Sequence, residues 1–430
     1  MTSIKESLLD FNPWWKEEFS IDFHQREAYT QIQKFLATPQ IIALTGLRRV
    51  GKTTIMLKIT EDAIKKGIPP KNIIYFSFDQ FKEIEIRNVL KEYEILAEKD
   101  LRQEKYILLL DEIQKVTNWE EQLKNIYDLF GKNTKIIISG SESLFLRKKS
   151  KETLAGRIFE FKIDTLTFKE YLAFTQTEHT PIGMHEQELS KQFSKFIQTC
   201  GFPELANTTD KEIIKKYIKE GIVEKIVYRD IPTMFKIKEI SVIEALLNIL
   251  MDGPGQIIEL SELAKELKLS RQTIANYLTY LEQSFLTRKL YNFSKSRRKT
   301  ERKLKKYYPA IISTDLLFKE DDFSKSKVFE WAIISQLKPE YFWRDPYKHE
   351  VDAVLIKDDQ AVPVEIKYGK IDTTGVTAFM KKFNIPEAII LSPNKEEKIS
   401  ANAKTVSILP AFKYLLKENE KMNFKKNRKL

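Results

Sequence analysis

The chain has 430 residues, 42% of them hydrophobic, a length that allows roughly two to four domains with cores of their own. Its 72 basic and 61 acidic residues give a net charge of +11, which suits an anionic partner. The single cysteine, Cys200, excludes an intramolecular disulfide. No apolar run reaches the ~18 residues of a membrane span, and residues 1–10 lack the pattern of a signal peptide. We therefore expect a soluble cytoplasmic protein with no membrane partner.

The first 20 residues form an N-terminal arm that is rich in aromatic side chains. We expect this arm to pack on the domain that follows it. An amphipathic pattern over residues 25–36 then predicts a helix that leads into the first strand.

A glycine-rich loop follows the apolar, β-prone run of residues 41–45, and a helical pattern follows the loop. The loop has the spacing GxxxxGK[ST], which curls the backbone so that its N–H groups point at phosphate oxygens. Lys52 is expected to reach the β- and γ-phosphates, and Thr53 is expected to ligate Mg²⁺. The sequence therefore predicts ATP and Mg²⁺ as cofactors. The predicted nucleotide-binding residues are Gly46, Leu47, Arg48, Arg49, Val50, Gly51, Lys52, Thr53 and Thr54.

Alternating apolar runs and helical patterns continue to about residue 175, which predicts a parallel α/β sheet. The strands are expected at residues 72–78, 106–110 and 135–140, and a core-facing helix at residues 119–130. Asp111 and Glu112 follow the second of these strands. We expect Asp111 to hold the Mg²⁺ shell and Glu112 to orient or polarise the attacking water.

Serines follow the next predicted strand, where a side chain can contact the γ-phosphate. Ser139 and Ser141 are both candidates for this sensor, and the sequence does not decide between them. Simple capping of the strand is the alternative for either serine.

Several stretches together resemble the AAA-type ATPases of bacteria and archaea that join a phosphate-loop domain to a C-terminal domain of unknown function. They are residues 45–54, residues 110–116 with Trp119, and residues 154–157, 201–204 and 228–230. The resemblance implies an additional-strand ATPase core, and it marks Arg157 as a candidate arginine trigger. From the residues alone, Arg157 can serve its own subunit, serve a neighbouring subunit, or pair with a carboxylate.

Two helical patterns over residues 176–235 predict a lid or connector, and residues 236–294 predict a winged helix-turn-helix. Ser261 and Ser270 are expected to cap its two successive helices, and residues 285–292 are expected to form the wing strand. The second helix begins with side chains suited to base edges, although packing against protein is the alternative. These residues are Arg271, Gln272, Thr273 and Asn276.

The densest positive charge covers residues 295–306 and includes Arg297, Arg298 and Arg302. Beside a helix-turn-helix, such a run is suited to the phosphates of DNA, and a solvated linker is the alternative. Residues 416–430 form a basic tail.

The last predicted domain, residues 295–415, contains a hairpin whose strands carry Asp352 and Glu365, with Lys367 two residues further on the same face. This D-x(n)-ExK pattern resembles the restriction-endonuclease-like fold, although Val351 stands where that family has proline. The resemblance implies carboxylates that hold Mg²⁺ and a lysine that assists the attack on phosphorus. Glu330 on the preceding helix would complete the set. A non-cleaving version of the fold is the alternative.

The sequence thus predicts an α/β phosphate-loop NTPase of the AAA type over residues 21–175, a helical lid, a winged helix and a C-terminal α/β restriction-endonuclease-like domain. We expect the protein to hydrolyse ATP and to act on nucleic acid or be regulated by it. The alternative is an ATP-dependent signalling or scaffolding switch. In that case the C-terminal domain binds a protein partner or a second copy of the chain.

Overall fold

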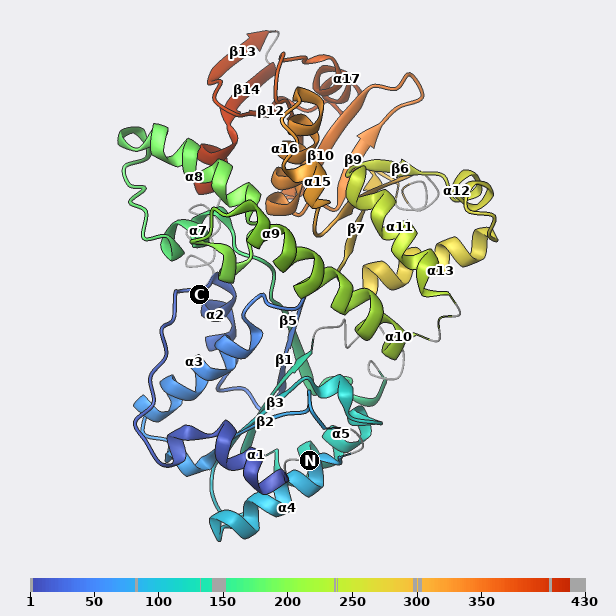
Figure 1. Cartoon of the computed structure of the whole chain (residues 1–430). Coiled ribbons are helices and arrows are strands. Elements are labelled where there is room, and N and C mark those ends of the chain that lie inside the picture. Colours follow the sequence, from blue (N-terminus) through green and yellow to red (C-terminus); the bar gives the residue numbers. More distant parts are fainter. Residues whose placement is uncertain are drawn as a thin grey trace. The chain divides into compact units, whose positions relative to one another are not determined.

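The computed structural model describes residues 3–81, 84–131, 133–140, 152–235, 237, 239–296, 300, 304–401 and 404–417. The predicted site residues Ser141, Arg297, Arg298 and Arg302 lie outside these ranges. The chain divides into two compact units, Met1–Asp164 and Thr165–Leu430, which we describe separately (Figure 1). Among the described helices, none combines the length and apolar character needed to cross a membrane.

Unit 1 contains a five-stranded parallel sheet of order β2-β3-β4-β1-β5. The strands are β1 (Ile41–Thr45), β2 (Ile73–Ser77), β3 (Tyr106–Asp111), β4 (Thr134–Gly140) and β5 (Ile158–Lys162). Every residue of β1 and β3 is buried, because helices cover both faces of the sheet. The predicted parallel α/β architecture is confirmed.

The helices of unit 1 lie on the two faces of this sheet (Figure 1). On one face, α1 (Ile4–Phe11), α4 (Ile86–Ala97) and α5 (Trp119–Phe130) share an apolar cluster with the strands. The other face carries α2 (Glu27–Gln33), which is shorter than expected, and α3 (Lys52–Lys65). The N-terminal arm packs as expected, since the indole nitrogens of Trp14 and Trp15 both donate to the carbonyl of Ile73.

Unit 2 begins with a series of helices. They are α7 (Phe168–Phe174), α8 (Glu186–Gln198), α9 (Lys211–Ile218) and α10 (Ile231–Met234), with two π-helical segments between the last two. Leu166, Phe168 and Phe193 share one apolar cluster with Phe412 and Leu416. The core of this unit therefore joins segments that are far apart in the sequence.

Residues 240–309 have the element order helix, strand, helix, helix, strand, strand. These elements are α11 (Ile240–Asp252), β6 (Gln256–Ile258), α12 (Leu260–Glu266), α13 (Arg271–Gln283), β7 (Thr287–Asn292) and β8 (Lys305–Pro309). Ser270 caps α13 as expected, because its hydroxyl accepts from the N–H of Thr273 at 3.0 Å. The cap predicted at Ser261 is wrong: α12 begins at Leu260 after an extended Glu259, so Ser261 lies inside the helix.

A nine-stranded mixed sheet runs through the rest of unit 2 in the order β13-β14-β12-β11-β10-β9-β7-β8-β6. Its further strands are β9 (Tyr341–Arg344), β10 (Glu350–Lys357), β11 (Gln360–Ile366), β12 (Glu387–Ser392), β13 (Glu397–Ala401) and β14 (Lys404–Pro410). The accompanying helices are α15 (Thr314–Leu317), α16 (Asp322–Leu337) and α17 (Thr374–Phe383).

The predicted hairpin of β10 and β11 is present, with Lys357 opposite Gln360. The boundary predicted between residues 294 and 295 falls between β7 and β8, which pair with each other. Strand β8 itself was missed, because its lysines were assigned to a basic linker.

Candidate functional site

The phosphate loop connects the carboxyl end of β1 to the first turn of α3. Gly51 has a φ of 95° and Gly46 a φ of 143°, values that L side chains rarely adopt. A Cβ on Gly46 would also collide with the carbonyl oxygen of Ile163. The ammonium of Lys52 donates to the carbonyls of Gly46 at 3.1 Å and Leu47 at 2.7 Å, so the lysine lies over the loop.

Asp111 at the end of β3 collects hydroxyl groups from neighbouring elements. Its Oδ2 accepts from Thr53 at 2.7 Å and from Tyr75 at 2.8 Å, and its Oδ1 accepts from Ser139. Burial, followed by the charge of Asp111, raises the pKa of Tyr75. The structure thus brings the predicted residues Thr53, Asp111 and Ser139 together. Sequence reasoning missed Tyr75, because a tyrosine inside a strand gives no sign of its partner.

Glu112 follows Asp111 in a left-handed conformation, with a φ of 56°. Its N–H donates to Asp111 Oδ1 at 3.1 Å, and its side-chain Oε2 accepts from Gln114 at 2.6 Å. This conformation is uncommon for a glutamate, and the contacts to Asp111 and Gln114 fix it. The carboxylate predicted to act on water is therefore held beside the predicted metal ligand.

Arg26 is a second residue of this site that sequence reasoning missed. Its side chain is buried, and its guanidinium donates to the carbonyl of Val50 at 2.9 Å and to that of Asp164 at 2.8 Å. It therefore connects the phosphate loop to the last residue of unit 1.

Arg157 lies at the opposite edge of the sheet. Its carbonyl accepts from the N–H of Ile41, at the amino end of β1, whereas the phosphate loop follows the carboxyl end of that strand. Its Nε lies 3.3 Å from Asp128 Oδ1. The structure does not bring Arg157 to the phosphate loop of its own chain, and this geometry contradicts the own-subunit alternative.

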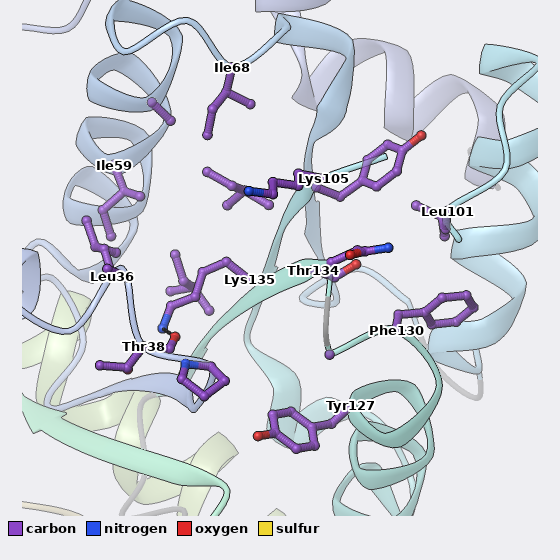
Figure 2. A pocket seen from close by; sticks show the side chains of 18 of the residues that line it. Leu36, Thr38, Ile59, Ile68, Leu101, Lys105, Tyr127, Phe130, Thr134 and Lys135 are labelled. Carbon is purple, nitrogen blue, oxygen red and sulfur yellow. Dashed lines mark hydrogen bonds between the residues drawn. The ribbon is translucent and has the colours of Figure 1, made fainter. Parts of the chain in front are cut away.

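A pocket of about 1110 Å³ also lies at the amino edge of the sheet, and Figure 2 shows most of the side chains that line it. Lys135 extends into it from β4 and donates to the carbonyls of Phe35, Thr38 and Gln40 at 2.7–2.9 Å. Burial lowers the pKa of Lys135 to about 8. Since three carbonyls already accept hydrogen bonds from this ammonium, Lys135 fixes the segment that enters β1. The residues that line the pocket do not include those of the phosphate loop, so the two sites are separate.

The residues predicted to contact DNA lie at the start of α13. Arg271, Gln272 and Asn276 are exposed, and Gln272 donates to the side chain of Asn276 at 2.9 Å. Thr273 is half-buried, and its hydroxyl lies 2.8 Å from that of Ser270. Within the described residues, these side chains form the polar surface of the helix start.

Lys306, assigned above to the phosphate-binding basic run, is buried instead. Its ammonium lies 3.1 Å from Glu330, 2.9 Å from Glu350 and 3.2 Å from Asp352. Tyr308, two residues along β8, donates to Glu330 at 2.5 Å. The prediction that Lys306 contacts a phosphate is therefore wrong, because three carboxylates already surround its ammonium.

The structure does bring the predicted nuclease residues together. Lys367 lies 2.7 Å from Glu365 Oε1, and Asp352 Oδ2 accepts from the N–H of Ile366 at 2.9 Å. Burial, followed by repulsion from Asp352, raises the pKa of Glu365 to about 8. Burial likewise raises the pKa of Glu330. Sequence reasoning missed Lys306, Tyr308 and Glu350.

A divalent cation does not fit this arrangement. Across the described parts of the chain, no three His, Cys, Asp or Glu side chains are grouped to hold a metal. The ammonium of Lys306 contacts three of the four carboxylates, including the predicted ligands Glu330 and Asp352. A cation would have to displace this lysine.

Family comparisons divide the chain into three segments. Residues 38–172 match the model described as an AAA domain, and this segment lies within residues 21–175, for which the AAA type is predicted. Residues 190–310 and 328–414 match two models that are each described as a domain of unknown function, DUF8612 and DUF4143.

The chain is also similar to individual proteins. An uncharacterized protein of Methanocaldococcus jannaschii is 28% identical over 398 residues, which are 84% of this chain and 82% of the relative. An uncharacterized protein of Haemophilus influenzae is 30% identical over 268 residues, 61% of this chain and 65% of the relative. The AMPPCP-bound structure of DnaA from Aquifex aeolicus is 19% identical and covers 61% of this chain and 89% of its own. Its TM-score of 0.28 does not establish a shared fold.

Proposed function

We propose that the chain binds and hydrolyses ATP at the loop of residues 46–54. The observation that carries this proposal is the hydrogen-bonded group of Thr53, Asp111 and Ser139 beside Lys52. These residues come from three separate elements, α3, β3 and β4, and meet where the strands end, which is where open parallel sheets bind their ligands. The AAA-domain match over residues 38–172 supports the same site.

The residues have separate tasks in this proposal. Lys52 exchanges the carbonyls of the loop for phosphate oxygens, and the loop N–H groups bind the same phosphates. The hydroxyl of Thr53 and the carboxylate of Asp111 are hard oxygen ligands that fit Mg²⁺, which neutralises phosphate charge when it is bound. Glu112 orients the attacking water and accepts its proton, and Ser139 lies where it can contact the transferred phosphoryl group.

The test is phosphate release and nucleotide binding by the full chain. Glu112→Gln should still bind ATP but lose turnover by at least about 100-fold, because the amide keeps the shape and removes the charge that acts on water. Lys52→Ala should weaken binding as well. Glu18→Gln, an exposed position in the arm, is the matched control. Full hydrolysis by both site variants would refute the assignment.

We further propose that unit 2 binds duplex DNA through α13 and the basic segment that follows β7. The support is the exposed polar start of α13 within an element order that fits a winged helix. Replacing Arg297, Arg298 and Arg302 by alanine should lower both the affinity and its dependence on salt. The control removes the same charge from unit 1, at the exposed residues Lys66, Lys71 and Lys91. Absence of duplex binding at low salt would contradict this role.

The alternative is a switch in which ATP controls docking of a protein partner and the C-terminal segment does not cleave. The contacts of Lys306 favour this alternative over metal-dependent cleavage by Asp352, Glu365 and Lys367. Nicking of DNA with Mg²⁺ or Mn²⁺ that Asp352→Ala abolishes, while ATP turnover persists, would favour cleavage instead.

A further inference from the structure

The acidic centre of the C-terminal segment receives part of its positive charge from another part of the chain, in addition to Lys367 and Arg344 of its own segment. Glu330, Glu350 and Asp352 belong to the segment that matches one family model, residues 328–414. Lys306 belongs to the segment that matches the other, residues 190–310. The ion pairs therefore cross from one family segment to the other within unit 2.

The geometry around Lys306 is that of a filled cation site. Its ammonium has three protons to donate, and carboxylate oxygens of three residues lie 2.9–3.2 Å from it. The residue is 4% exposed and Asp352 is 8% exposed, so water does not share these contacts to any large extent. The buried ammonium of Lys306 is held firmly by its three carboxylates, because its removal would leave their negative charges uncompensated.

The same contacts cross the shortest strand pairing among the described residues of the nine-stranded sheet. Strands β7 and β9 pair through only Tyr291–Tyr341 and Asn292–Phe342 among the described residues. Lys306 on β8 reaches Glu350 and Asp352 on β10, beyond this pairing. The helix-turn-helix side of the sheet is thus tied to the C-terminal side by ion pairs as well as by the short strand pairing.

Gly255 allows α16 and β8 to approach each other closely at the same point. It has a φ of 79°, and a Cβ there would lie 2.9 Å from Glu330 Oε1 and 3.1 Å from the ring of Tyr308. Glu330 also accepts from the hydroxyl of Tyr308. Glycine at this position leaves the space that Glu330 needs to meet both Lys306 and Tyr308.

We infer that Lys306 is a built-in cation that takes the place of a divalent metal in the acidic centre and locks residues 240–309 onto the C-terminal segment. The centre is then independent of metal in the native chain. Removal of the lysine should leave Glu330, Glu350 and Asp352 without their shared cation, so that these carboxylates can draw together around Mg²⁺ or Mn²⁺.

The experiment measures Mn²⁺ binding to the nucleotide-free full chain from the loss of the electron paramagnetic resonance signal of free Mn²⁺. Every protein carries Asp111→Asn, so that the ATP site does not contribute metal binding. With Lys306 present we expect no Mn²⁺ at the acidic centre. Lys306→Ala should bind one Mn²⁺ per chain at least about tenfold more tightly, and Mn²⁺ should raise its thermal midpoint.

Two further variants act as controls for the charge and the site. Lys306→Arg keeps a cation in place and should bind no Mn²⁺. Lys306→Ala combined with Asp352→Asn should lose the new site. If Lys306→Ala does not fold without metal, refolding it in Mn²⁺ and in Mn²⁺-free buffer makes recovery of folded protein the readout. Recovery that Mn²⁺ does not increase would overturn the inference.

The inference is also overturned if a chain with Lys306 in place binds stoichiometric Mn²⁺ that Asp352→Asn removes, because a metal would then displace the lysine. It is equally overturned if folded Lys306→Ala binds no Mn²⁺.

Discussion

Arg26 illustrates how one buried side chain can set the shape of a functional loop. It donates to Val50 inside the phosphate loop and to Asp164 beyond β5. Both carbonyls would lack these donors if the guanidinium were removed, and an unsatisfied buried carbonyl costs roughly 1–3 kcal/mol.

We predict that Arg26→Ala lowers the stability of unit 1 by about 1–3 kcal/mol and weakens ATP binding, because the loop loses a support without losing a phosphate ligand. Thermal unfolding and nucleotide titration of the full chain measure the two effects. Arg87→Ala, at an exposed arginine of α4, should change neither. Unchanged ATP affinity in Arg26→Ala would show that the loop does not depend on this contact.

Cys200 gives a second prediction at this scale, because it is the single thiol of the chain. It is buried, and burial raises the pKa of its thiol to about 12. The reactive thiolate is therefore scarce at pH 8 and increases as the pH rises toward 12. Native protein at pH 8 should react with a thiol reagent at least about 100-fold more slowly than protein unfolded in urea. Rapid labelling of the native chain would contradict the burial of this residue.

Part of the candidate site could be predicted residue by residue, and part could not. Thr53 and Asp111 follow from the sequence, and Ser139 is one of the two serines it offers, because parallel strands with their loops must end at one edge of a sheet. Arg26 and Lys306 do not follow, because their partners lie at least 24 residues away and no local pattern reports such a contact.

At the scale of elements, the spacing of apolar residues predicts strands and helices where that spacing is regular. The strands β1 and β3 and the helix α5 were expected from continuous or periodic apolar residues. Strand β8 was not, because Lys305 and Lys306 made its sequence resemble a solvated linker. Only the tertiary structure shows that one of these lysines is buried.

The two serines of the helix-turn-helix provide a matched pair. Ser270 caps α13, whereas Ser261 lies exposed within α12. Ser270→Ala should therefore destabilise unit 2 by about 1 kcal/mol, and Ser261→Ala should change its stability by no more than a few tenths of a kcal/mol. Chemical denaturation followed by fluorescence compares them. Equal losses in the two variants would mean that the start of α12 differs from the structure.

At the scale of the whole chain, the compact units do not end where the sequence pattern suggested. The predicted ATPase domain ended at residue 175, whereas unit 1 ends at Asp164. The difference is α7, whose Phe168 and Tyr171 pack with α8 and the end of the chain. A helical pattern shows which side of a helix is apolar, but it does not show which core will receive that side.

Arg157 gives a prediction about assembly. Since it lies at the edge of the sheet opposite its own phosphate loop, only a nucleotide held by a neighbouring copy is available to it. Arg157→Ala and Glu112→Gln should each lack turnover alone, and a mixture of the two should regain part of it. Asp128→Asn should retain turnover, because it removes only the partner of Arg157 in the free chain.

Phosphate release by the separate and mixed proteins, measured at several total concentrations, decides the question. Full activity of Arg157→Ala alone would leave Arg157 with its ion pair to Asp128 as its only role.

The shared core of unit 2 has a consequence for the order in which the chain is made. Leu166 and Phe168 are synthesised roughly 250 residues before Phe412 and Leu416, which corresponds to a delay of about 12–50 s at ribosomal rates. Unit 1 has all its strands by Lys162 and can complete its sheet during that interval. The apolar side of α7 is fully buried only after the last residues of the core have been synthesised. A chain released before residue 412 would lack the part of this core that Phe412 and Leu416 supply, and the apolar side chains that they cover would stay exposed to chaperones and proteases.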